Sequence, residues 1–461
     1  MIRWFFVNHI GFYSLLIGFG AFAYAMDSAE ETSSPFSPDF EAASNLPFEE
    51  SLSTLSPLVP EPVDFGTDVI NALAADPLGP VADPNVDAVP TFGESEIDTV
   101  VVPQEAENRL WRIRPYVKTG VTYDDNIFIT ETNRTGDIIY NLEGGFSFEL
   151  GDYRDLQNNY LLLEYLGSGF FFMNHPAQNS FDQNLSLLAQ YRVTQLAIQL
   201  ESTYQTLNGA DRQAGAFTSR SLFFNALRFV YTKSEKTDLE FEINQSTNLY
   251  PDQISSYISE AQLSFNYKVQ PKLSLGLEAI LGLDQAQDSP DQVYQTLNAL
   301  CAYDIAGKLM LKASVGLQLN QYVSGGENMR IIPVFSVGAE YQLFQKTSLA
   351  LNAYRNLQNS PSLAGQDYIA TGFDIGLKQD LSQKIKIALA VGYENDTYIS
   401  NLVDVNASRV DNFYFFRPGV SYSFLKYLDA NFSYEYRTNA SNIPQNSWFD
   451  NRLNCELSLN F

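Results

Sequence analysis

The stretch LNCELSLNF, residues 453–461, decides the fold of this chain. Apolar or aromatic residues stand at every second position, and the residues between them are Asn454, Glu456, Ser458 and Asn460. A period of two is the side-chain period of a β-strand. Chain ends usually fray in water, so an alternating strand that ends on Phe461 predicts an apolar environment for one of its faces.

The same alternation recurs throughout residues 109–461. Examples are LEFEINQ (239–245), LSLGLEAILGL (273–283), IKIALAVGY (385–393) and LDANFSYEY (428–436). No run with helical periodicity stands out in this region, so the pattern predicts an all-β fold. We count eighteen such segments, which begin near Arg112, Thr135, Asn158, Phe181, Thr194, Phe217, Lys236, Ser256, Lys272, Val293, Lys308, Arg330, Lys346, Tyr368, Lys384, Asn412, Tyr427 and Phe449.

The links between these segments are of two kinds. Two or three residues follow most even-numbered segments, whereas longer polar links such as NGADRQAGA and DQAQDSPDQ follow the odd-numbered ones. The link GDYRDLQN, after the second segment, is an exception. Short turns at one end and long loops at the other are typical of a transmembrane antiparallel up-and-down β-barrel. An even number of strands, about 18, places both termini on the periplasmic side of a bacterial outer membrane.

Periodicity alone does not distinguish a membrane barrel from a soluble β-sandwich, but three features favour the barrel. Aromatic residues gather near strand ends, as in FYFF (413–416) and YEYR (434–437), which suits interfacial girdles. The polar faces carry charges of both signs in mid-strand. The last strand also resembles the carboxy-terminal signature by which bacterial outer-membrane proteins are handed to their assembly machinery. That resemblance implies that Phe461 is part of an assembly signal.

A barrel of this size is wide enough for an aqueous channel. The strand parity predicts charged wall positions at Arg114, Lys118, Glu143, Glu164, Arg220, Arg228, Glu278, Lys312, Arg330, Glu340, Arg417 and Arg452. One interpretation is a basic ladder that guides anionic solutes. The other, which we favour because the two signs are mixed, is that these charges pair across neighbouring strands and keep the lumen wet.

The first 108 residues have a different character. Residues 1–25 read as a secretory signal, with Arg3, an apolar core and Ala23-Tyr24-Ala25 as a cleavage site. An uncleaved anchor is the alternative, but the apolar run is short for a spanning helix. Residues 26–108 contain 18 acidic residues, no Lys or Arg, and 11 Pro. This composition predicts a disordered periplasmic arm, either a spacer or a segment that binds a periplasmic partner.

The segment RPYVKTGVTYDDNIF, Arg114–Phe128, combines a basic-Pro opening, a strand and the run Tyr123-Asp124-Asp125-Asn126. It resembles the amino-terminal hallmark of the putative beta-barrel porin type 2 family, some relatives of which are associated with exopolysaccharide operons. The resemblance implies a barrel over residues 109–461. The Asp-Asp-Asn run is either a strand exit into a polar turn or a contact for calcium or lipopolysaccharide.

Two functions of different classes follow. The first is a porin that forms a passive aqueous channel for small hydrophilic solutes. The alternative is an outer-membrane component or anchor of a surface polysaccharide export system, which a continuous track of lumen aromatics would favour. The inward candidates for such a track are Tyr116, Tyr160, Phe170, Tyr294 and Phe413. Oligomeric state is not determined by these patterns.

Catalysis and cofactor binding have little basis in this sequence. His175 is the one His after the signal segment, and a hydrolase built from His175, Asp182 and Ser180 is the only catalytic alternative. Cys301 and Cys455 lie on the apolar side of their segments and predict neither a disulfide nor a metal site. A net charge of −26 disfavours nucleic-acid binding. We therefore expect a non-enzymatic protein without cofactors, whose partners are membrane lipids and the outer-membrane assembly machinery.

Overall fold

A computed structural model describes residues 110–151, 159–305, 308–323, 329–400 and 409–460 of the chain. Eighteen strands dominate these residues. They are β1 (Trp111–Asp124), β2 (Asp137–Gly151), β3 (Tyr160–Phe172), β4 (Ser180–Val193), β5 (Leu196–Asp211), β6 (Ala216–Ser234), β7 (Thr237–Leu249), β8 (Ser256–Gln270), β9 (Leu273–Ala286), β10 (Gln292–Ile305), β11 (Leu309–Tyr322), β12 (Arg330–Phe344), β13 (Thr347–Asn359), β14 (Gln366–Asp380), β15 (Ile385–Ser400), β16 (Val410–Leu425), β17 (Leu428–Ser441) and β18 (Trp448–Asn460).

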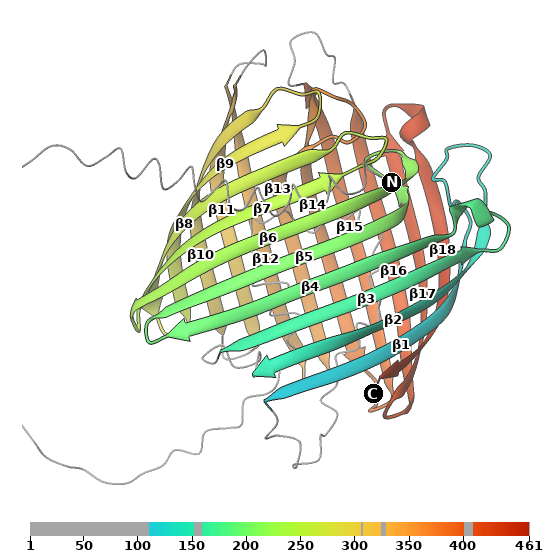
Figure 1. The fold of residues 1–461 in the computed structure, drawn as a ribbon, viewed down its shortest axis with the longest axis horizontal. Helices are drawn as coiled ribbons and strands as arrows, with labels where there is room; N and C mark the ends of the chain where they lie inside the picture. Colours follow the sequence, from blue (N-terminus) through green and yellow to red (C-terminus); the bar gives the residue numbers. More distant parts are fainter. Residues whose placement is uncertain (1–109, 152–158, 306–307, 324–328, 401–408, 461) are drawn as a thin grey trace, which may run out of the picture. The chain divides into compact units, whose positions relative to one another are not determined.

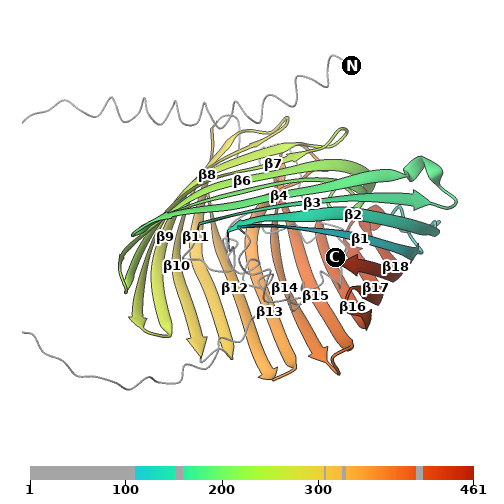
Figure 2. The same ribbon diagram turned by 60° about the horizontal axis from the view of Figure 1, so that its bottom comes forward.

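The strands form one closed antiparallel sheet in which each strand pairs with its neighbours in the chain. β1 pairs with β2 on one side and with β18 on the other, so the sheet has no free edge (Figures 1 and 2). Closure runs from Tyr116 opposite Asn460 to Asp124 opposite Arg452. Closure matters because an open edge in lipid would leave backbone groups without hydrogen-bond partners.

The two faces of the sheet differ in polarity as the alternation predicts. In β9, Leu277 and Leu281 are 60% and 61% exposed. Glu278 and Ile280, which lie between them in the sequence, are each 2% exposed. The exposed large hydrophobic residues of the other strands follow the same parity, and the buried residues opposite them are mostly polar. An apolar outer face around a polar inner face is the arrangement that lipid requires of a barrel.

The strand count, the fold class and the approximate strand starts predicted from the sequence are confirmed. Every predicted start lies within two residues of the observed one, because each start coincides with the end of a turn signal. Cys301 and Cys455 are free thiols. Among the described residues, no helix is long and apolar enough to cross a membrane. The predicted signal, the arm, Phe461 and most of the GDYRDLQN link lie outside the described residues.

Candidate functional site

The inner face of the barrel is the candidate functional site, and all twelve predicted wall residues lie on it. Their parity is consistent around the sheet: Lys118 lies opposite Glu143, Arg228 opposite Glu242, and Glu340 opposite Met310. Lys118, Glu143, Arg220 and Glu278 are buried among other inner side chains. Whether they line a path for solutes remains a separate prediction.

Ion pairs between neighbouring strands occupy the inner wall from β16 round to β2. Arg417 pairs with Glu435 at 2.6 Å, Arg452 with Asp124 at 2.9 Å, and Arg114 with Glu149 at 3.0 Å. Lys118 lies 3.1 Å from Glu143 and 3.8 Å from Glu456, and Arg437 lies 2.6 Å from Asp450. The basic residues on this side are therefore balanced by carboxylates, which agrees with pairing and not with a basic ladder.

A tight turn between β5 and β6, residues 212–215, projects into the lumen. Asp211 organises it: one carboxylate oxygen accepts the backbone amides of Gln213 (2.8 Å) and Ala214 (2.9 Å). The other oxygen accepts the hydroxyl of Tyr250 (2.7 Å) and a guanidinium nitrogen of Arg220 (2.9 Å). Gly215 closes the turn at φ +67°, a backbone conformation that residues with a Cβ rarely adopt.

The side chains of this turn contact the opposite wall of the barrel. The Arg212 guanidinium pairs with Asp396 at 3.0 Å and also with Glu394, both on β15. Gln213 donates to Asp396 at 3.1 Å and accepts the hydroxyl of Tyr398 at 2.7 Å. By the shorter path round the sheet, seven strands, β4, β3, β2, β1, β18, β17 and β16, lie between β5 and β15. We call these contacts of Arg212 and Gln213 the mouth bridge, since they cross the lumen near its long-loop end.

The mouth bridge carries fixed charge. Burial alone would lower the pKa of the Arg212 guanidinium, but the carboxylates of Asp396 and Glu394 raise it well above its usual value. Arg212 also lies over the ring of Phe413, 4.5 Å from its centroid. Arg409, just before β16, behaves similarly: burial opposes its charge, yet Tyr398 and Asp411 raise its pKa. Both cations therefore stay charged at any physiological pH.

A second loop, residues 360–365 between β13 and β14, also crosses part of the mouth. The carbonyl of Pro361 accepts the amide of Ile254 at 2.9 Å, and the amide of Gly365 donates to the hydroxyl of Ser289 at 2.8 Å. Arg409 reaches Ser362 from the β16 side. Links that follow β7, β9 and β13 are thus joined to one another. These contacts therefore narrow the lumen at the long-loop end of the barrel.

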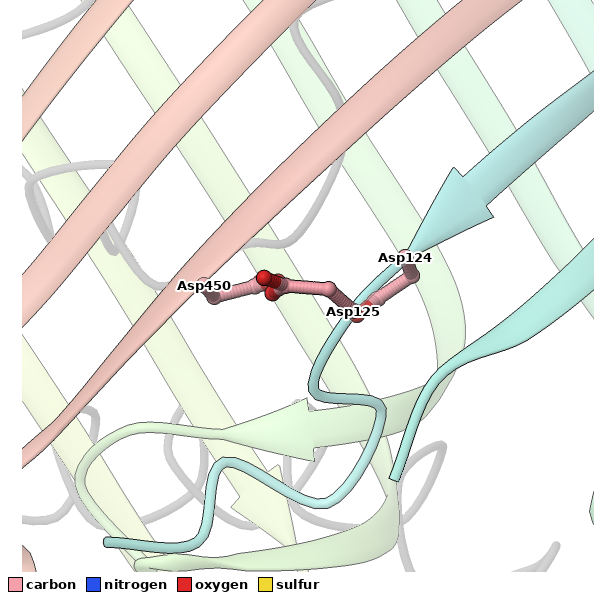
Figure 3. Close-up of side chains that lie close together, drawn as sticks. All are labelled: Asp124, Asp125 and Asp450. Carbon is pink, nitrogen blue, oxygen red and sulfur yellow. The ribbon is translucent and has the colours of Figure 1, made fainter. Parts of the chain in front are cut away.

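The Asp-Asp-Asn run lies where β1 meets β18, and its carboxylates form a cluster with Asp450 (Figure 3). One carboxylate oxygen from each of Asp124, Asp125 and Asp450 lies within 4.8 Å of the others. Each carboxylate already has a cationic partner: Arg452 for Asp124, Arg134 for Asp125, and Arg437 for Asp450. Asn126 is fully buried and donates to the carbonyls of Thr130 and Phe449. The arrangement fits a strand exit fastened to β18 better than a calcium site.

The catalytic alternative is not assembled as the sequence suggested. His175 Nδ1 lies 2.7 Å from Asp137, at the start of β2, whereas Asp182 accepts hydrogen bonds from Asn208. Asp137 also accepts the backbone amide of Asn174. The acidic partner of His175 was missed because it belongs to a different strand. The other hydrogen bonds of Asp137 tie the link between β3 and β4 to β2, which is a structural role.

The five candidate aromatics lie on the inner face, and Phe413 and Tyr294 among them have different surroundings. Phe413 packs with Ile129, Ala210 and Trp448 beneath the mouth bridge. Tyr294, on β10, donates its hydroxyl to Glu260 of β8. Tyr160 lies on β3. These differing contacts offer no support for a sugar-binding track.

Comparison with known proteins adds one family match. Residues 340–461 match the family described as putative beta-barrel porin 2, while no curated protein matches the chain. Similar solved structures include the outer membrane protein opdK from Pseudomonas aeruginosa, with 13% identity over 76% of this chain and 99% of that chain and a TM-score of 0.40. Another is Acinetobacter baumannii OccAB3, with 11% identity over 76% and 99% and a TM-score of 0.41.

The family match and the earlier resemblance fall at opposite ends of the barrel. The resemblance rests on Arg114–Phe128, at β1, whereas the match begins near the end of β12 and continues through β18. Since β1 and β18 are paired, the two segments meet at the closure of the sheet. The predicted resemblance is confirmed for this segment: residues 340–461 match the putative beta-barrel porin 2 family, and they form part of a closed eighteen-stranded antiparallel β-barrel.

Proposed function

We propose that this protein is an outer-membrane channel through which small hydrophilic solutes diffuse passively, with both termini on the periplasmic side. The observation that carries the proposal is the division of the closed sheet into an exposed apolar face and a charged inner face. Buried charges are costly unless they are paired or hydrated, and a water-filled lumen supplies that hydration at modest cost.

The mouth bridge and the loop of residues 360–365 define how wide such a channel can be. Both segments cross the lumen near its long-loop end. Buried ion pairs and hydrogen bonds fasten them to other parts of the barrel. Solutes would pass beside these loops, so the size limit of the channel is set by the mouth and not by the barrel wall. The contacts of the inner-face aromatics do not favour a polysaccharide track, and we do not propose an export role.

The test is swelling of liposomes that contain the refolded protein in solutions of neutral sugars of graded size. A passive channel predicts rapid swelling in the smallest sugars and a steep decline as the solute approaches the width of the mouth. Liposomes without protein supply the baseline. Swelling no faster than this baseline in every sugar would contradict the proposal.

A further inference from the structure

One part of the inner wall carries more carboxylates than ion-paired cations. Glu242 on β7, Glu260 on β8 and Glu278 on β9 lie on three neighbouring strands and share the inner face. The register places Gln262 opposite Glu242 and Asn244 opposite Glu260. We call Glu242, Glu260 and Glu278 the acidic wall.

The donors to the acidic wall are mostly neutral. Glu278 accepts hydrogen bonds from Gln262 (2.6 Å), Ser264 (3.1 Å) and Asn298 (2.7 Å). Glu260 accepts the hydroxyl of Tyr294. Neutral donors hold a carboxylate in place but leave its charge in the lumen.

Ion pairing at the acidic wall is correspondingly sparse. Arg228 lies 2.5 Å from Glu242. Within the part of the chain that the structure describes, no ion pair reaches Glu260 or Glu278. This contrasts with the wall from β16 to β2, where Arg417, Arg437, Arg452, Arg114 and Lys118 all pair with carboxylates.

A second observation points to a positively charged occupant. The side-chain oxygens of Asn244, Gln262 and Asn298 are buried and accept no hydrogen bond. The three residues are 2%, 8% and 1% exposed. Their amide nitrogens are turned to the carboxylates of Glu242 and Glu278, which leaves these oxygens as additional acceptors. Carboxylate and amide oxygens are the ligand atoms that hard cations prefer, so this part of the wall favours cations over anions.

The three carboxylates of the acidic wall are spread over three strands and do not form a compact chelating site. The one group of three carboxylates close enough to hold a metal ion, among the described residues, is that of Asp124, Asp125 and Asp450. The wall would therefore attract cations that keep their hydration shell and remain mobile. Clefts lined by one sign of charge concentrate ions of the opposite sign.

We propose that the acidic wall makes the channel selective for small cations, inorganic or organic, over anions. This inference rests on the proposed channel function and assigns it a substrate class. Anions would be repelled by Glu260 and Glu278, whereas the paired charges on the opposite wall contribute little net field. Selectivity of this origin weakens as salt rises, because the screening length falls to about 10 Å at 0.1 M salt.

The test is the reversal potential of the full-length protein in a planar bilayer across a gradient of KCl. The wild type is expected to give a potential of the sign that marks K⁺ as the more permeant ion. The double variant Glu260→Gln, Glu278→Gln should move this potential toward zero. Glu235→Gln, which removes an exposed carboxylate from the turn between β6 and β7, should leave it unchanged.

The outcomes separate this inference from the proposed function. Conductance with a preference for Cl⁻, or with a K⁺ preference that the double variant retains in full, would overturn the cation inference and leave the channel intact. An absence of conductance would overturn both. Should the double variant fail to refold, the sign of the wild-type potential decides, and Glu278→Asp, which keeps the charge, should retain it.

Discussion

The carboxylate of Asp125, at the exit of β1, accepts both the backbone amide and the side-chain amide of Asn451 in β18, each at 2.8 Å. The two residues are 326 positions apart in the sequence. Their contact fastens the first strand to the last where the barrel closes. The run that carries the family resemblance therefore has a physical role in closure, independent of any ligand.

Asp125→Ala is expected to destabilise the barrel by about 1–3 kcal/mol, because it removes two hydrogen bonds from a partly buried seam. The variant should lose its folded, faster-migrating band at a lower temperature than the wild type when samples are heated in detergent before electrophoresis. Asp252→Ala, in an exposed link, is the matched control. Equal unfolding temperatures for Asp125→Ala and the wild type would contradict the closure role.

The polarity of the two faces predicts opposite results for adjacent residues of β4. Leu185 is 39% exposed on the outer face, whereas Ser186 lies on the inner face opposite Glu164. Leu185→Arg should cost about 2–4 kcal/mol in lipid, the cost of a cation near mid-membrane, and Ser186→Arg should cost far less. The free energy of unfolding in urea, measured in lipid vesicles, decides. Similar costs for both variants would contradict the assignment of the faces.

The mouth bridge predicts a change in conductance. Arg212→Ala removes the cation that links the turn of residues 212–215 to Asp396 and Glu394, and breaking a buried pair leaves uncompensated charge worth about 3–5 kcal/mol. We expect the turn to detach and the unit conductance to rise. Arg212→Lys keeps a cation there and should give a smaller rise. An unchanged or lower conductance in Arg212→Ala would show that the bridge does not limit the mouth.

The carboxylate cluster at the closure predicts insensitivity to divalent ions. Arg452, Arg134 and Arg437 already balance Asp124, Asp125 and Asp450. The unfolding temperature of the purified protein should therefore be the same in excess EDTA and in millimolar Ca²⁺. A rise in calcium that Asp125→Asn abolishes would instead favour the metal-binding interpretation of the Asp-Asp-Asn run.

Much of the barrel could be predicted from sequence because period-two alternation is a local property. The parity of Lys118 and Glu143 could be read in the same way, and their pairing follows once β1 and β2 are neighbours. The mouth bridge could not be predicted. Arg212 and Gln213 lie in a polar link without periodicity, and their partners on β15 are more than 180 positions away. The only local signal is Asp211, a turn-forming residue directly before them.

The same reasoning explains the missed partner of His175. Asp182 is near His175 in the chain, whereas folding brings Asp137 to it from the start of β2. The acidic wall is not evident from the sequence alone. Its member Glu278 is one of the predicted wall positions, but the neutral character of most of the donors depends on the register of four strands.

We propose above all that the polar inner face encloses a water-filled path across the membrane. Single-channel recording of the refolded full-length protein in a planar bilayer tests it most directly. We predict discrete, long-lived current steps of uniform size at low voltage, larger in Arg212→Ala than in the wild type. An absence of current from both the correctly folded wild type and Arg212→Ala would contradict a water-filled path and show that the lumen is closed.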